Sequence, residues 1–94
     1  MEEKVEYNQH TEPNEYRYFS PAWLDAVARG LTDGAKEYPG QTWKDIPATE
    51  HLWRALRHIV LWQMGDRTDN HIIHASMRCM MAFETDKAEN STIE

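Results

Sequence analysis

The chain has few residues that would cross-link a small fold. Its 94 residues include one cysteine, Cys79, so no disulfide can form within the chain. A chain of this size buries only about 60% of the surface that it exposes when unfolded, and domains below about 70–80 residues usually need a disulfide, a metal or a partner chain. We therefore expect a metal, self-association or tight helix packing to supply stability. Cys79 lies in an apolar run, which predicts a small buried hydrophobe in a cytoplasmic protein.

Long apolar runs are also absent. Nothing in the sequence approaches the roughly 20 consecutive apolar residues that a membrane-spanning helix needs. The first residues, Met1-Glu2-Glu3-Lys4, are acidic where a signal peptide is basic and then apolar. The pattern predicts a protein that stays in the cytoplasm and has no membrane partner.

The negative charge of the chain is confined to its ends. The net charge is −6 at pH 7. Residues 1–15 carry five acidic side chains against one basic, and residues 85–94 carry three against one. Residues 16–84 are neutral, so neither a DNA mimic nor direct DNA binding is expected. We predict a folded domain over 16–84 between an acidic disordered tail at 1–15 and a disordered tail at 85–94.

Three segments of the middle region carry the apolar spacing of amphipathic helices. They run from Ser20-Pro21 to Pro39-Gly40, from about Thr49 to Met64 with Gly65 as a cap, and over about 71–84 after an N-cap at Asp69 or Asn70. The apolar residues predicted to face the core are Leu24, Val27, Ala28, Leu31 and Ala35 in the first segment, and Leu52, Leu56, Ile59 and Val60 in the second. The aromatic side chains of Tyr16, Tyr18, Phe19 and Trp23 are expected to close the core.

The third segment is apolar over most of its circumference, which is typical of a helix that is buried or lies in an interface. One stripe holds Ile73, Met77 and Met80, and another holds Ile72, Cys79 and Phe83. A monomer of three helices covers only one of these stripes well. The sequence therefore predicts an all-α fold, a small bundle of three main helices that self-association completes.

The polar residues of the last two segments are spaced to face each other, because helices joined by a five-residue turn are antiparallel neighbours. Glu50, Arg54, Arg57 and His58 lie on one face of the second segment, His71, His74 and Arg78 on one stripe of the third, and Asp66 and Asp69 in the turn. Such a cluster binds a phosphorylated ligand through arginine or a divalent metal through Asp and His. The alternative is a solvated stripe with local His–Asp hydrogen bonds. His51, on the other side of its helix, is expected at the surface.

Short motifs follow one another between Arg17 and Glu84. They are Arg17-Tyr18 before the proline-capped helix, Gly34-Ala35-Lys36-Glu37-Tyr38, Thr42-Trp43, Ala55-Leu56-Arg57-His58, and His71-Ile72-Ile73-His74-Ala75. Their order and spacing resemble the phage-encoded MazG-like domains described as dATP/dGTP diphosphohydrolases. The chain departs from the family pattern at Glu37, Thr42 and Arg78, where Lys, Asn and Asn are usual, and it lacks the Glu-Ser-Gly before the first histidine, so one acid of the turn is missing.

The resemblance implies a MazG-like bundle that hydrolyses a purine deoxynucleoside triphosphate to monophosphate and pyrophosphate with Mg²⁺. Phosphate contacts would come from Lys36, Arg57, His58 and Arg78, and base stacking from Tyr38 or Trp43. Arg54 would also bind the nucleotide. Glu50, Asp66 and Asp69 would hold Mg²⁺, and the catalytic residues would be Asp69, His58, His71 and His74.

The missing acid favours a rival interpretation. In it, a non-enzymatic member of the same fold binds a nucleotide or a host defence protein and acts as an anti-defence inhibitor in the cytoplasm of the host cell. A structural or assembly protein is a third class. The expected partners are thus a purine nucleotide, further copies of the chain and, in the rival interpretation, a host protein.

Overall fold

The structure is a computed structural model that describes the backbone of residues 13–90 and the side chains of residues 13–87. The elements are two 3-10 helices, η1 (Tyr16–Tyr18) and η2 (Thr42–Asp45), and three α-helices, α1 (Pro21–Glu37), α2 (Ala48–Gln63) and α3 (His71–Asn90). No strand occurs within these residues, so the predicted all-α fold with three main helices is confirmed. None of the helices described is long and apolar enough to cross a membrane.

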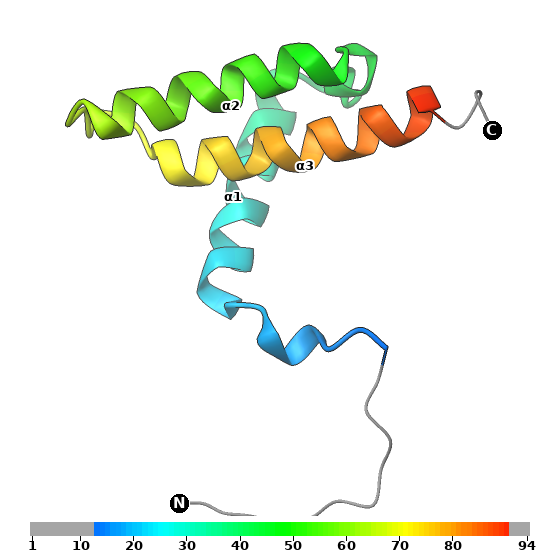
Figure 1. Cartoon of the computed structure of the whole chain (residues 1–94), viewed down its shortest axis with the longest axis horizontal. Helices are drawn as coiled ribbons and strands as arrows, with labels where there is room; N and C mark the ends of the chain where they lie inside the picture. Colours follow the sequence, from blue (N-terminus) through cyan, green and yellow to red (C-terminus); the bar gives the residue numbers. More distant parts are fainter. Residues whose placement is uncertain (1–12, 91–94) are drawn as a thin grey trace, which may run out of the picture.

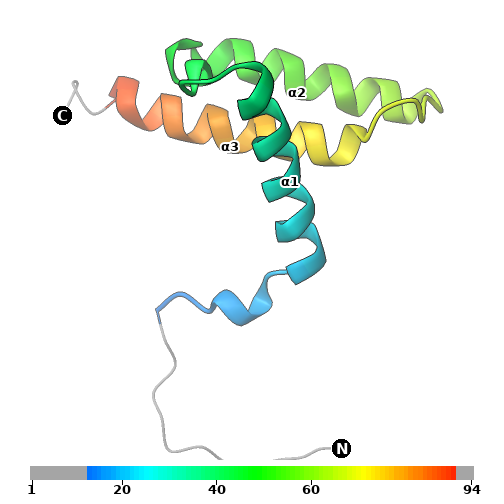
Figure 2. The same ribbon diagram turned by 180° about the vertical axis from the view of Figure 1, so that it is seen from behind.

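The helices α2 and α3 form an antiparallel hairpin, and α1 crosses one face of it (Figures 1 and 2). The hairpin turn follows from local sequence. Gly65 has a positive φ of 93°, a conformation that glycine adopts without steric cost. Asn70 caps α3, because its side-chain oxygen accepts from the Ile73 N–H at 3.4 Å and its carbonyl from the His74 N–H at 3.0 Å.

The start of α1 and its crossing of α3 depend on a cap and a glycine. The Ser20 hydroxyl oxygen accepts a hydrogen bond from the Trp23 N–H at 3.1 Å, as the sequence predicts. The Trp23 indole in turn donates to the Ser76 hydroxyl at 3.1 Å. At Gly30 the end of the Met77 side chain lies against α1, and an added Cβ would lie 2.5 Å from its sulfur. The absence of a side chain at Gly30 therefore leaves room for Met77 where α1 crosses α3.

Alanines predominate among the buried side chains of α2 and α3, where Ile73 and Met81 of α3 are the large apolar residues that are buried. Ala48, Ala55, Ala75 and Ala82 are buried, together with the rings of His51 and His71. The stripe predicted to face the core from α2 faces outward instead: Leu52, Leu56, Ile59 and Val60 are 52%, 45%, 46% and 44% exposed. The prediction for α2 is wrong because short side chains let the helices approach along a different face. In α1, Val27 is the member of the predicted stripe that is buried.

Three further expectations differ from the structure. The helix α3 continues beyond residue 84 to Asn90, since no glycine or proline interrupts it and the buried Thr85 hydroxyl donates to the Met81 carbonyl at 3.0 Å. Cys79 is exposed, because it lies on the stripe of α3 that faces neither neighbouring helix. Tyr16, Tyr18 and Phe19 are exposed and do not close the core. The predicted division into a domain at 16–84 and tails at 1–15 and 85–94 stays a prediction, and residues 1–12 and 91–94 lie outside the described residues.

Candidate functional site

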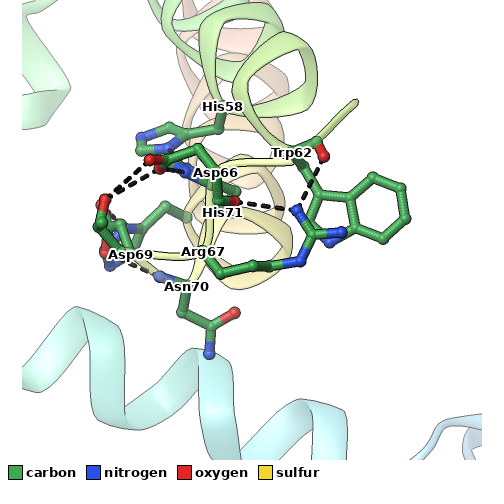
Figure 3. A network of polar contacts seen from close by, with 9 residues as sticks. His58, Trp62, Asp66, Arg67, Asp69, Asn70 and His71 are labelled. Atoms are coloured by element: carbon green, nitrogen blue, oxygen red, sulfur yellow. Dashed lines mark hydrogen bonds and ion pairs between the residues drawn. The ribbon is translucent and has the colours of Figure 1, made fainter. Parts of the chain in front are cut away.

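Hydrogen bonds link Asp66 in the hairpin turn to His71 of α3 and, through it, to His58 of α2 (Figure 3). The Asp66 carboxylate lies 2.5 Å from Nε2 of His71, and Nδ1 of His71 lies 2.9 Å from Nδ1 of His58. The Thr68 hydroxyl donates to the same carboxylate. His71 is buried, whereas His58 and Asp66 are partly exposed. The predicted encounter between the polar faces of the two helices is confirmed at this end of the hairpin.

His74 and Asp69 complete this cluster. Nδ1 of His74 lies 3.0 Å from a carboxylate oxygen of Asp69, and the rings of His58 and His74 are 5.2 Å apart. One ligand atom from each of His58, Asp69 and His74 lies within 4.8 Å of the others. Imidazole nitrogen and carboxylate oxygen are both metal ligands. Within the described residues, this is the group of three that could hold an ion, whereas Glu50, Asp66 and Asp69 do not form one.

The electrostatics of the cluster keep its carboxylates ionised and His58 neutral. Burial lowers the pKa of His58, and the nearby His74 lowers it further. The hydrogen bond from His71 lowers the pKa of Asp66. Burial alone would raise the pKa of Asp69, but hydrogen bonds from the Asn70 N–H and from His74 outweigh it and lower that pKa. Metal ligands bind in their deprotonated form, and these shifts favour that form for Asp66, Asp69 and His58.

His51 links the η2 segment to Arg78. Its side chain is fully buried, with Nε2 2.9 Å from the Trp43 carbonyl oxygen and Nδ1 3.0 Å from the Arg78 guanidinium. Because arginine and a carbonyl fix the two partners as donor and acceptor, the ring is neutral and protonated on Nε2. The expectation of a surface His51 is wrong, since this side of α2 packs on α3. It lies three residues after Ala48 and four before Ala55, a spacing that marks one face of a helix, but only the packing of α2 on α3 identifies this face as the buried one.

Arg78 lies between two hollows of the surface. The first, of about 450 Å³, opens between the end of α1, η2 and the hairpin, and it contains Tyr38, Trp43, Arg54 and Arg78 among its lining residues. The second, of about 380 Å³, is lined by Glu50, Trp53, Arg54, Arg57, His58 and Arg78. Burial and the neighbouring Arg54 lower the pKa of Arg78. The aromatic groove, the arginines and His58 therefore form one continuous surface.

Three further residues were predicted to bind the nucleotide or the metal, namely Glu50, Lys36 and Arg57. Glu50 accepts from Arg54 at 3.0 Å, one turn along α2. Lys36 is exposed and lies 3.7 Å from Asp33. Arg57 is exposed at the second hollow. The structure thus brings Tyr38, Trp43, Arg54 and Arg78 together in one groove, and His58, His71, His74, Asp66 and Asp69 together at the turn.

Comparisons with known proteins agree with the fold and the motifs. No curated protein and no solved structure matches the chain significantly. A family model, however, matches residues 3–93, nearly the whole sequence. Its description is dATP/dGTP diphosphohydrolase, N-terminal, and the chain therefore belongs to this MazG-like family.

Proposed function

We propose that this domain binds a purine nucleotide in the 450 Å³ groove, with the phosphates on Arg54 and Arg78. The observation that carries the proposal is that two guanidiniums share a groove with the aromatic rings of Tyr38 and Trp43. Arginine binds phosphate through charge-assisted hydrogen bonds, and an aromatic ring offers a face on which a purine stacks. The family description supports a purine deoxynucleotide as the ligand.

The balance of charge in the groove supports an anionic ligand. Arg78 donates to the neutral ring of His51 rather than to a carboxylate, and it lies near Arg54 in a half-buried position. Glu50 is paired with Arg54 and offsets one of these charges. A phosphate group placed between Arg54 and Arg78 would relieve their mutual repulsion. Arg57, at the second hollow, would then reach the far end of a chain of phosphates.

The arrangement of the carboxylates favours a protein that binds the nucleotide without hydrolysing it. Of the three acids predicted to hold Mg²⁺, Glu50 is paired with Arg54 and Asp66 with His71. Mg²⁺ prefers oxygen ligands in octahedral geometry, and these three residues do not form a group within the described part of the chain. A binder of this kind would act as a nucleotide sponge against a host defence in a phage-infected cell.

Hydrolysis to monophosphate and pyrophosphate is the second candidate. The family description favours it, and His58, Asp69 and His74 lie beside the hollow that holds Arg57. Mg²⁺ usually reaches such sites through one or two carboxylates and the substrate phosphates, so Asp66 or Asp69 would hold it. When bound, Mg²⁺ would supply positive charge to the phosphates and activate water.

Calorimetry with the full chain tests both candidates. We expect purine nucleotides, linear or cyclic, to bind wild-type protein, and Arg78→Ala to weaken binding at least tenfold, a loss of about 1.4 kcal/mol. Arg17→Ala is the matched control, because Arg17 is exposed and pairs with Glu15 outside the groove. A pyrophosphate assay with Mg²⁺ then separates the candidates. Failure of every nucleotide to bind would reject both and would leave a host protein as the ligand.

A further inference from the structure

The geometry points to a site for a divalent transition-metal ion of the zinc class, with His58, Asp69 and His74 as ligands and His71 and Asp66 as their outer support. One ligand atom from each of the first three lies within 4.8 Å of the others. Zinc–ligand bonds of about 2.0–2.2 Å would draw these atoms closer together, and the ion would replace the hydrogen bond of 3.0 Å between His74 and Asp69. This site is not the set of carboxylates that the sequence predicts for Mg²⁺. The two sets share only Asp69.

The hydrogen bonds around His58 leave a ring nitrogen free for a metal. Nδ1 of His58 and Nδ1 of His71 face each other at 2.9 Å, so one must donate and the other accept. The Asp66 carboxylate accepts the proton of His71 Nε2 at 2.5 Å. In the pair of tautomers that satisfies both contacts without a charged ring, His71 accepts at Nδ1 and His58 donates from Nδ1. Nε2 of His58 therefore carries a lone pair.

This chain of contacts has the form of an outer shell of a metal site. Histidines that bind metals usually donate their other N–H to a carboxylate, a carbonyl or water, which fixes the orientation of the ring. Here His71 lies between His58 and Asp66 and forms a hydrogen bond with each (Figure 3). His71 is buried, so its ring is held by packing as well as by hydrogen bonds. A solvated polar stripe would not require a buried histidine between His58 and Asp66.

The donor set selects the class of metal. Two imidazoles and one carboxylate suit zinc and its neighbours in the first transition series, whereas Mg²⁺ and Ca²⁺ prefer oxygen ligands. Three protein ligands leave a position open for water or another oxygen ligand. His58 also lines the hollow that holds Arg57 and Arg78. An ion here would therefore lie next to the phosphate end of the proposed nucleotide site, although the metal site itself does not depend on that proposal.

The test is a metal titration of the full chain without nucleotide. Zn²⁺ is followed by calorimetry and Co²⁺ by its visible absorption, with Mg²⁺ as the comparison. We expect one Zn²⁺ or Co²⁺ per chain and at least a tenfold loss of affinity in Asp69→Asn and in His74→Ala. Asp45→Asn, at the other end of the hairpin in η2, is the matched control and should bind like wild type.

Two further variants separate the roles of the residues. Asp66→Asn weakens the outer support and should lower Zn²⁺ affinity by about tenfold, at the lower end of what outer-shell changes cost. Arg78→Ala should bind Zn²⁺ like wild type even where it loses nucleotide, so the two proposals can fail separately. Circular dichroism establishes that each variant is folded. Zn²⁺ binding no tighter than Mg²⁺, or equal Zn²⁺ binding in wild type, Asp69→Asn and His74→Ala, would overturn the site.

Discussion

The Arg78 guanidinium on α3 donates a hydrogen bond to Nδ1 of the fully buried His51 on α2, at 3.0 Å. The opposite nitrogen of the same ring donates to the Trp43 carbonyl oxygen at 2.9 Å. One buried ring thus fixes both an arginine and an aromatic segment of the proposed nucleotide groove. The positions of Arg78 and Trp43 are therefore coupled through His51.

Removing the His51 ring should weaken both the fold and the groove. In His51→Ala the Trp43 carbonyl oxygen keeps the Ile46 N–H at 3.1 Å but loses the His51 donor, and the lost hydrogen bond costs about 0.5–1.5 kcal/mol of unfolding free energy. Arg78 loses its acceptor at the same time, so nucleotide affinity should fall as well. Urea unfolding measures the first effect and calorimetry the second. Thr49→Ala, at an exposed position of α2, serves as the control, and equal stability of the two variants would contradict the role of His51.

The two glycines of α1 should respond differently to alanine. Gly34→Ala should stabilise the protein by up to about 1 kcal/mol through helix propensity, because nothing lies within 4 Å of the new Cβ. Gly30→Ala should gain less or lose stability, because its Cβ would meet the Met77 sulfur at 2.5 Å. Thermal melts of both variants check the difference. The reverse order would show that α1 does not cross α3 at Gly30.

Acid should remove the stabilisation that Asp66 provides. The hydrogen bond from His71 holds the pKa of Asp66 below its ordinary value of 3.8 in the folded protein. A carboxyl with a lowered pKa stabilises the fold above its unfolded pKa, and this contribution is lost as the pH falls through the folded value. Urea unfolding, measured as the pH falls through these pKa values, should show a smaller loss of unfolding free energy in Asp66→Asn than in wild type. If the unfolding free energies of wild type and Asp66→Asn depend on pH in the same way, Asp66 does not provide this stabilisation.

The outward apolar face of α2 predicts self-association. Leu52, Leu56 and Ile59 lie on it, and Ile72 and Phe83 of α3 are exposed as well, 56% and 67%. Contiguous apolar surface of this kind usually marks an interface, and we propose that a second copy of the chain covers it. Leu56→Asp should shift the protein to monomers in sedimentation velocity. Thr49→Asp, at a more polar position of α2, should not, and a wild-type monomer at micromolar concentration would reject the proposal.

Local features of the fold follow from the sequence alone. The Ser20 cap, the positive φ of Gly65 and the Asn70 cap all occur where the residue types predict them. Such signals depend on a few neighbouring residues, so no tertiary information is needed to locate the ends of the helices. The antiparallel hairpin and the encounter of His58 with His71 follow from the short turn in the same way.

Which face of each helix is buried was decided by tertiary packing. Along α2, one stripe holds Leu52, Leu56 and Ile59, and another holds Ala48, His51 and Ala55. The larger apolar residues favour burial of the first, yet the second packs on α3, because alanines let the two backbones approach and His51 finds two hydrogen-bond partners there. Hydrophobicity along a sequence measures the gain from burying a side chain, but it carries no information on the shape of the neighbour. That is why the fold class was predictable from the residues, whereas the buried His51 was not.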